Sequence, residues 1–162
     1  MKPIVGLLIA LVTPLRTVLA QTTSGSGGGG LTVGWARVAD TSALEFDGRY
    51  WKGSFGTGPR FDGTFGVDLS FGHHIVPYTV LDADLGYAIG FDADATTCLV
   101  LRGGGSVWFL LENGGGFGEN LGVEFRRHLR KSEAAWVLDL NWRRFPGLTL
   151  PSITVGLVAY DF

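Results

Sequence analysis

Cysteine, charged residues and long hydrophobic runs are all scarce in this sequence. The single cysteine, Cys98, excludes a disulfide framework within the chain. The formal net charge of −2 argues against a nucleic-acid partner, since nucleic-acid-binding proteins usually carry a clear basic excess. Charged residues make up only 17% of the chain, which is low for a surface that faces water. No apolar run approaches the roughly twenty residues that a transmembrane helix needs.

The first residues have the features of an export signal. Lys2 supplies a positive start, residues 4–12 form an apolar run, and residues 18–20 provide a small-residue cleavage site. We therefore predict a signal peptide over residues 1–20. Residues 21–30 consist mainly of Gly, Ser and Thr, and this composition predicts a flexible Gly/Ser linker that buries nothing.

The stretch 61–71 shows the pattern that dominates the rest of the chain. Its odd positions are apolar or Gly and its even positions are polar or small, so a β-strand places the two classes on opposite faces. Similar segments continue to the last residue, and we predict strands at 31–39, 44–55, 61–71, 80–92, 98–112, 119–129, 134–144 and 152–162. The second segment fits least well, because Trp51 is out of phase with Phe46, and this predicts a bulge near Gly48.

Eight neighbouring strands without a helix-period segment predict an all-β fold over residues 31–162. Short connections favour an eight-stranded antiparallel up-and-down barrel. The connections predicted at one end are residues 40–43, 73–79, 113–118 and 145–151. The same alternation suits two arrangements: a soluble, lipocalin-like periplasmic barrel with its apolar face inward, or a transmembrane barrel with its apolar face outward.

The composition of the two faces favours the transmembrane arrangement. Small residues and a few charges of both signs fit the narrow lumen of an eight-stranded barrel, where buried charges must pair. The predicted lumen charge network comprises Asp62, Asp68, Asp82, Asp84, Arg102, Glu124, Arg126, Asp139 and Arg143. Aromatic residues on the apolar face fall at two levels, as in the girdles of membrane barrels. These predicted girdle residues are Trp35, Phe61, Phe71, Phe91, Phe109, Trp136 and Trp142.

The leader, the eight strands and the terminal V-A-Y-D-F resemble the small outer-membrane β-barrel proteins of Gram-negative bacteria, the OmpX/OmpA-like and opacity-type group. The resemblance implies an outer-membrane location, with both termini on the periplasmic side and contact with lipid and lipopolysaccharide. It also implies that Val158, Tyr160 and Phe162 form the signal read by the barrel-assembly machinery. Alternate residues such as Ile153 would then face the lumen. We expect a monomer with a structural or surface-interaction role and a lumen plugged by its charges.

A lipid A-modifying enzyme, of the deacylase or acyltransferase type, is the main alternative. Such an enzyme needs an activated nucleophile beside a base, and the candidates are His73, His74, His128 and Ser132. The H-x-S motif that the deacylases carry is missing from the sequence. His73 and His74 with Asp68 also lack the spacing of a metal site. We therefore favour a non-enzymatic role, and expect neither a metal nor another cofactor.

Two arginines have the parity of the lipid-facing side, Arg127 at the inner end of the sixth strand and Arg144 at the outer end of the seventh. A charge costs about 2–4 kcal/mol at the bilayer midplane but little near the interface, so both are predicted at the rims. Arg144 is the candidate for contact with lipopolysaccharide phosphate through its planar guanidinium group. A thin cation pathway along the acidic lumen residues stays open as an alternative to the plug.

Overall fold

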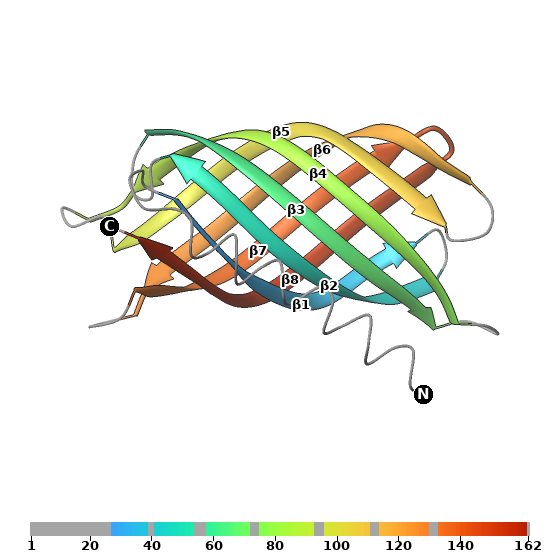
Figure 1. Cartoon of the computed structure of the whole chain (residues 1–162), viewed down its shortest axis with the longest axis horizontal. Helices are drawn as coiled ribbons and strands as arrows, with labels where there is room; N and C mark the ends of the chain where they lie inside the picture. The colour runs from blue at the N-terminus through green and yellow to red at the C-terminus, as the bar shows by residue number, and fades with distance from the viewer. Residues whose placement is uncertain are drawn as a thin grey trace.

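The computed structural model describes residues 27–38, 41–53, 58–71, 75–92, 96–110, 114–129 and 133–161, so the predicted signal peptide lies outside the described residues. The chain forms strands β1 (Gly27–Val38), β2 (Thr41–Gly53), β3 (Gly58–Phe71), β4 (Ile75–Gly90), β5 (Thr97–Leu110), β6 (Gly114–His128), β7 (Ala134–Phe145) and β8 (Leu148–Asp161). Each strand pairs antiparallel with the next, and β1 pairs with β8, which closes the sheet (Figure 1). The predicted eight-stranded antiparallel up-and-down barrel is confirmed. The described part of the chain contains no helix long and apolar enough to cross a membrane.

Several strands extend further than the sequence pattern indicated. β1 begins at Gly27, so Gly27–Gly30 belong to the barrel and not to the predicted linker. β4, β6 and β8 begin inside the stretches 73–79, 113–118 and 145–151 that the sequence analysis assigns to loops. Pro77 lies in β4, in register with Leu69 of β3. Pairing with the neighbouring strands overrides the weak strand propensity of Gly and Pro at these positions.

Close approach between β1 and β8 explains why a glycine run begins the barrel. A Cβ added to Gly30 would lie 2.1 Å from the carbonyl oxygen of Leu157, and one added to Gly34 would lie 1.9 Å from that of Ile153. A Cβ on Gly156 in β8 would lie 2.0 Å from a carbonyl oxygen of β1. Real Cβ atoms do not approach backbone oxygens this closely, so lack of space requires glycine at this seam.

The bulge predicted near Gly48 is absent. The register of β2 is continuous with both β1 and β3. Trp51 is out of phase with Phe46 because it faces the barrel interior, where it is 1% exposed, whereas Phe46 faces outward. The guanidinium groups of Arg60 and Arg126 stack over the Trp51 ring, which explains how an aromatic side chain fits among charged residues.

The facing of β8 is opposite to the prediction. Ile153, Val155 and Leu157 are exposed on the outside of the barrel, and Val158 is completely buried inside. The neighbouring strand fixes this facing, because Leu157 is in register with Leu31, which also points outward. The alternation in β8 is therefore intact but shifted by one position relative to the prediction.

The strands are strongly tilted. A row of paired residues that starts at Gly27 on β1 crosses every strand and reaches Pro151 on β8. Continuing the register one position past the Ala36–Ser152 pair returns this row to β1 at Arg37, ten residues from its start (37 minus 27). For eight strands this offset corresponds to a tilt of about 40°. Residues at one level of the barrel therefore come from different rows.

Two turns show how neighbouring strands are joined. Pro146 and Gly147 form the two-residue turn between β7 and β8, and Gly147 has a φ of 75°, a region that favours glycine. At the opposite end Asp92 lies beyond β4, not in the strand predicted for it, and accepts hydrogen bonds of 2.6 Å from the backbone and hydroxyl groups of Thr96. These hydrogen bonds hold the pKa of Asp92 below its usual value. Their contribution to stability is present at neutral pH and is lost as the pH falls through that pKa.

Candidate functional site

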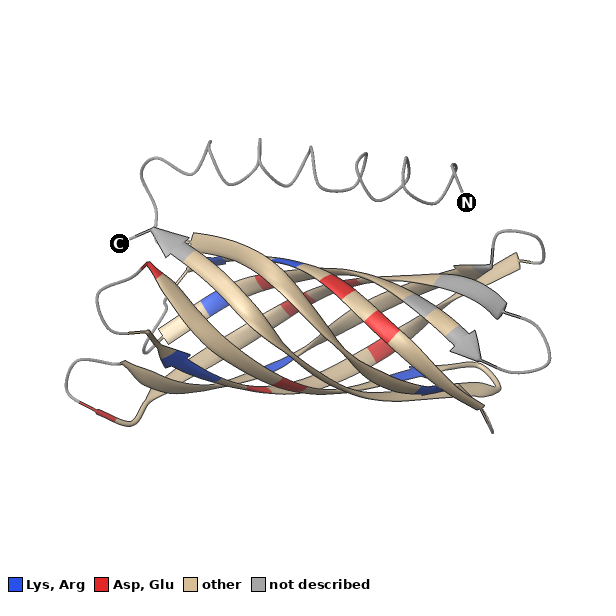
Figure 2. Ribbon diagram, turned by 90° about the horizontal axis from the view of Figure 1, so that it is seen from below, with Lys and Arg blue, Asp and Glu red and all other residues tan. Residues whose placement is uncertain are grey.

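The barrel has an apolar outside and a charged inside. Large hydrophobic side chains point outward from every strand, among them Trp35 at 57% exposed and Leu85 at 76%. Charged positions lie along the bodies of the strands (Figure 2). Among the described residues the interior holds five arginines and seven carboxylates: Arg49, Arg60, Arg102, Arg126, Arg143, Glu45, Asp47, Asp62, Asp82, Asp84, Glu124 and Asp139. A lipocalin-like barrel would have the reverse arrangement, so that alternative is wrong.

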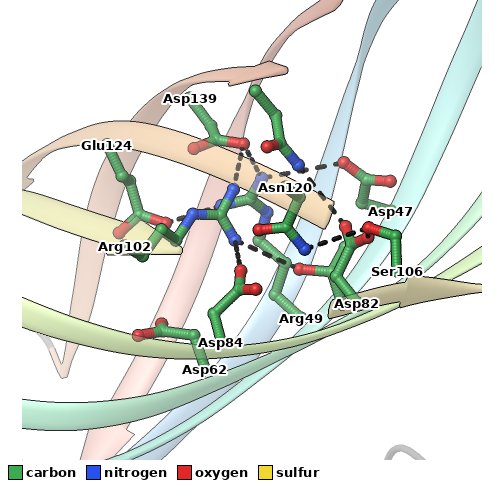
Figure 3. Close-up of polar contacts among 12 residues, drawn as sticks. Asp47, Arg49, Asp62, Asp82, Asp84, Arg102, Ser106, Asn120, Glu124 and Asp139 are labelled. Atoms are coloured by element: carbon green, nitrogen blue, oxygen red, sulfur yellow. Dashed lines mark hydrogen bonds and ion pairs between the residues drawn. The ribbon is translucent and has the colours of Figure 1, made fainter. Parts of the chain in front are cut away.

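Two arginines converge on one carboxylate, that of Asp139 in β7. Arg49 from β2 donates a hydrogen bond from Nη2 to Asp139. Its Nη1 donates a second one to Glu124, at 2.6 Å. Arg102 from β5 donates to the same oxygen of Asp139 at 2.6 Å and lies 3.4 Å from Asp84. Figure 3 shows these side chains meeting in the interior. All five are nearly inaccessible to solvent, and in such surroundings each charge depends on its partners.

A second ionic group surrounds Trp51, toward the end of the barrel where β1 begins. Arg60 donates from Nε and Nη2 to the two carboxylate oxygens of Asp62, at 2.7 and 2.6 Å. Arg126 pairs with Glu124, which thereby joins this group to the Arg49 group. The guanidinium carbons of Arg60 and Arg126 lie 4.5 and 5.0 Å from the centre of the Trp51 ring. Ion pairing and cation–π contact together hold both cations in the interior.

A single arginine faces three carboxylates nearer the other end of the barrel. Arg143 lies 2.6 Å from Glu45, 2.9 Å from Asp82 and 4.0 Å from Asp47. Asp82 also accepts a hydrogen bond from Ser106. These contacts connect β2, β4, β5 and β7 across the interior.

Apolar residues fill the interior beyond the Arg143 group. Val80, Phe145 and Leu150 are buried together there. Trp108 is packed against them, with its ring edge-on to Phe145 at a centroid distance of 6.1 Å. Since Trp51 packs with buried Val158 toward the opposite end, the ion pairs of Arg49 and of Arg143 lie between two apolar clusters.

The structure buries eight of the nine residues predicted for the lumen charge network inside the barrel: Asp62, Asp82, Asp84, Arg102, Glu124, Arg126, Asp139 and Arg143. Asp68 lies in β3 in register with Glu45, but its side chain is outside the described ones. Four further charges were missed: Glu45, Asp47, Arg49 and Arg60. Glu45, Asp47 and Arg49 occupy alternate positions of β2, as expected for one face of a strand. This alternation was overlooked because a bulge was assumed near Gly48.

The structure places the predicted girdle aromatics on the outside of the barrel. The exposed ones are Trp35, Phe61, Phe91, Phe109, Trp136 and Trp142. The strand directions put three of them, Phe61, Phe91 and Trp136, toward the end where β1 begins, and the other three toward the opposite end. The side chain of Phe71 is outside the described ones. Phe117, which is 80% exposed, was missed because its position was assigned to a loop.

Outward-facing charges on the described strands lie close to strand ends. Arg37, Lys52, Arg127 and Arg144 each precede the last residue of a strand. Glu119 lies further inside β6, but it is 3.8 Å from Arg144, and both side chains are more than 70% exposed. Between these positions the described outward surface is uncharged, so an apolar belt surrounds the barrel.

Of the four residues considered for catalysis, the structure describes only His128. His73, His74 and Ser132 lie outside the described ranges. His128 is the last residue of β6, at the end of the barrel where β1 begins. Within the described ranges, no group of three or more His, Cys, Asp or Glu residues is arranged to hold a metal ion.

A closed eight-stranded antiparallel barrel with this distribution of side chains has the architecture of small outer-membrane barrel proteins. The chain is similar to Ail, the attachment invasion locus protein of Yersinia pestis, with a TM-score of 0.58 and 9% identity over 85% of this chain and 99% of Ail. It is also similar to Neisserial surface protein A, with a TM-score of 0.56 and 12% identity over 83% and 95% of the two chains. A de novo designed transmembrane β-barrel gives a TM-score of 0.55 and 11% identity over 83% and 96%. No protein-family model and no curated protein matches the sequence. These similarities establish the fold.

Proposed function

We propose that this protein is an outer-membrane β-barrel, exported by a signal peptide over residues 1–20, with a structural or surface-interaction role. The observation that carries the proposal is the reversed distribution of side chains, with Leu, Val and aromatic residues outside and the charges inside. Closure of the sheet pairs the backbone groups of all eight strands, as a lipid environment requires. The surface role is in keeping with the names of Ail and Neisserial surface protein A, which share the fold.

Heat-modifiability of the membrane fraction tests the proposal. We expect the folded barrel to resist detergent and to migrate differently on a gel before and after boiling, because its closed sheet unfolds only on heating. The measurement compares boiled and unboiled samples of outer-membrane and soluble periplasmic fractions. Identical migration, or recovery of the protein in the soluble fraction, would refute an outer-membrane barrel.

The orientation that we propose puts the end where β1 begins, and where β8 finishes, on the periplasmic side. Arg144 then lies at the outer rim, beside Trp142 on the same strand. Its 3.8 Å separation from Glu119 is long for an ion pair, and its side chain is 72% exposed. The guanidinium group can therefore contact the phosphate of lipopolysaccharide at the level of the lipid headgroups.

We propose further that the interior is a plug and not a pore. Ion pairs join residues of β2, β5, β6 and β7 across the lumen, and apolar clusters lie on both sides of them. An ion crossing the barrel would have to displace buried charge pairs, which is costly in a low dielectric. The purified protein is expected to give no steady single-channel current in planar lipid bilayers. A stable cation-selective current would favour the cation pathway and overturn the plug.

The last strand is proposed to carry the signal read by the barrel-assembly machinery, with the protein as a monomer. Val158 is buried on the interior side of β8. The side chain of Tyr160 and the whole of Phe162 lie outside the described residues. β8 forms the closing pair with β1, so a machinery that reads β8 would act at the strand that completes the barrel.

A further inference from the structure

The excess negative charge of the interior is concentrated in one place. Around Trp51 and Asp139, four arginines face four carboxylates, Asp62, Asp84, Glu124 and Asp139, so that group balances. The remaining interior charges of the described chain are Arg143 with Glu45, Asp47 and Asp82. If all three carboxylates were ionised, their counter-charges would be Arg143 and, at 3.7 Å from Asp47, Arg49, which already pairs with Glu124 and Asp139. A buried charge that lacks a counter-charge is strongly unfavourable, so something must compensate it.

Asp47 is the least compensated of the three carboxylates. Glu45 and Asp82 each have an Arg143 nitrogen within 3 Å, whereas the nearest nitrogens to Asp47 are those of Arg49 at 3.7 Å and Arg143 at 4.0 Å. Thr32 donates a hydrogen bond of 3.3 Å to Oδ2 of Asp47. The other oxygen, Oδ1, is buried and accepts no hydrogen bond, although Asp47 is only 2% exposed.

Further acceptor atoms without donors surround this position. Oε2 of Glu45 is buried without a hydrogen-bond partner. So is Oδ1 of Asn120, whose side chain is 2% exposed and whose Nδ2 is already donated to Ser106. On the β3 side, the residue next to Oδ1 of Asp47 is Gly66, which has no side chain that could donate a hydrogen bond. A Cβ added there would already lie 2.7 Å from this oxygen. The acceptors without a partner outnumber the donors here, because the one such donor of Arg143, Nη2, lies 4.0 Å from Oδ1 of Asp47 and donates no hydrogen bond to it.

We propose that Glu45 and Asp47 hold one proton between them at neutral pH, so that the pair carries a single negative charge. A Cβ added to Gly66 would lie 2.7 Å from Oδ1 of Asp47 and 3.7 Å from Oε1 of Glu45, so both carboxyl groups approach the same point beside β3. Two ionised carboxylates repel each other there, whereas a carboxylic acid and a carboxylate can share a hydrogen bond. A shared proton supplies a donor to the carboxylate oxygens that accept no hydrogen bond, Oδ1 of Asp47 and Oε2 of Glu45. A metal ion could in principle supply the missing positive charge instead, but no group of three or more described His, Cys, Asp or Glu residues is arranged to hold one.

The groups facing this pair come from each element packed around it. Thr32 lies on β1, Arg49 on β2 itself, Asp82 on β4 and Arg143 on β7. From β3, Gly66 faces the pair, and Asp68 is in register with Glu45. Asp82 competes with the pair for Arg143, and this competition favours retention of the proton.

Infrared spectroscopy of the folded protein in detergent tests the proposal directly. At neutral pH we expect a carboxylic-acid C=O band, distinct from the carboxylate bands, which disappears in Asp47→Asn. The matched control is Asp62→Asn, since Asp62 accepts hydrogen bonds from Nε and Nη2 of Arg60, and this variant is expected to keep the band. Wild-type protein without such a band at neutral pH would overturn the proposal, even if both variants failed to fold.

The pH dependence of unfolding provides the second readout. A retained proton favours the folded state below the pH at which it dissociates, so wild-type stability should fall from neutral to mildly alkaline pH. Asp47→Asn, which keeps the shape and supplies a donor, should lose this decline. Parallel profiles for the two proteins would contradict the shared proton. A third comparison measures wild-type stability in sodium and in choline salts at equal ionic strength. If sodium stabilised the wild type more than choline did, and Asp47→Asn abolished the difference, a metal cation would supply the compensating charge and the shared proton would be contradicted.

Discussion

Gly34→Ala is expected to prevent the barrel from closing. The added Cβ would lie 1.9 Å from the carbonyl oxygen of Ile153, more than 1 Å inside the 3.0 Å limit that real Cβ atoms respect. The obstructing atom belongs to the backbone of β8, so a side-chain rotation cannot relieve the overlap and β1 must move away from β8. We expect the free energy of unfolding to fall by more than about 3 kcal/mol, which is at or above the upper end of the usual cost of overpacking. The measurement is the fraction of protein that becomes heat-modifiable on refolding into detergent or lipid vesicles.

Gly63→Ala is the matched control, because it makes the same exchange on the open side of the sheet. The nearest atom to a Cβ at Gly63 is the carbonyl oxygen of Asp82, at an ordinary contact distance of 3.8 Å. Glycine within a strand is entropically unfavourable by roughly 0.5–1 kcal/mol relative to alanine, so this variant should fold as well as the wild type or slightly better. Equal folding yields for the two variants would show that the β1–β8 seam is wider than the structure indicates.

The alternation of residue types was sufficient to predict the fold, because it is a local property. A period of two appears in each segment by itself, and eight such segments with short connections leave few arrangements. The same locality limited the facing of individual strands. The phase of Trp51 relative to Phe46 was interpreted as a bulge, yet the strand is regular and Trp51 lies inside against two arginines. The facing of β8 was reversed because the C-terminal aromatic residue was taken to face lipid.

Contacts between distant segments could not be read from the pattern. The run Gly27–Gly30 has the composition of a linker, and only the approach of β8 shows why glycine is required there. The charged pairs depend in turn on strand tilt: Arg143 meets Glu45, 98 positions earlier in the chain, because the offset of the register brings β2 and β7 residues to one level. The sequence indicated that the interior charges must pair, but the register decides which ones do.

Asp139→Leu is expected to be the most destabilising exchange of an interior charge. One carboxylate oxygen of Asp139 accepts hydrogen bonds from both Arg49 and Arg102, and the side chain is 1% exposed. Arginine does not lose its proton in proteins, so removal of Asp139 leaves two buried cations short of a counter-charge. Breaking a buried ion pair in this way costs about 3–5 kcal/mol. Urea unfolding of the barrel in lipid vesicles, followed by tryptophan fluorescence, measures the change in the free energy of unfolding.

Two further variants distinguish a loss of charge compensation from a general effect of substitution. Glu119→Gln removes a carboxylate from the exposed pair with Arg144 and should change stability by no more than about 1 kcal/mol. Arg102→Met, added to Asp139→Leu, removes one of the uncompensated cations and should recover part of the loss, although each exchange alone destabilises. This recovery is a coupling that a cavity or a simple packing defect would not produce. If the double variant were less stable than Asp139→Leu alone, the interior would be held together by packing around these side chains, and the ionic network would not be its main source of stability.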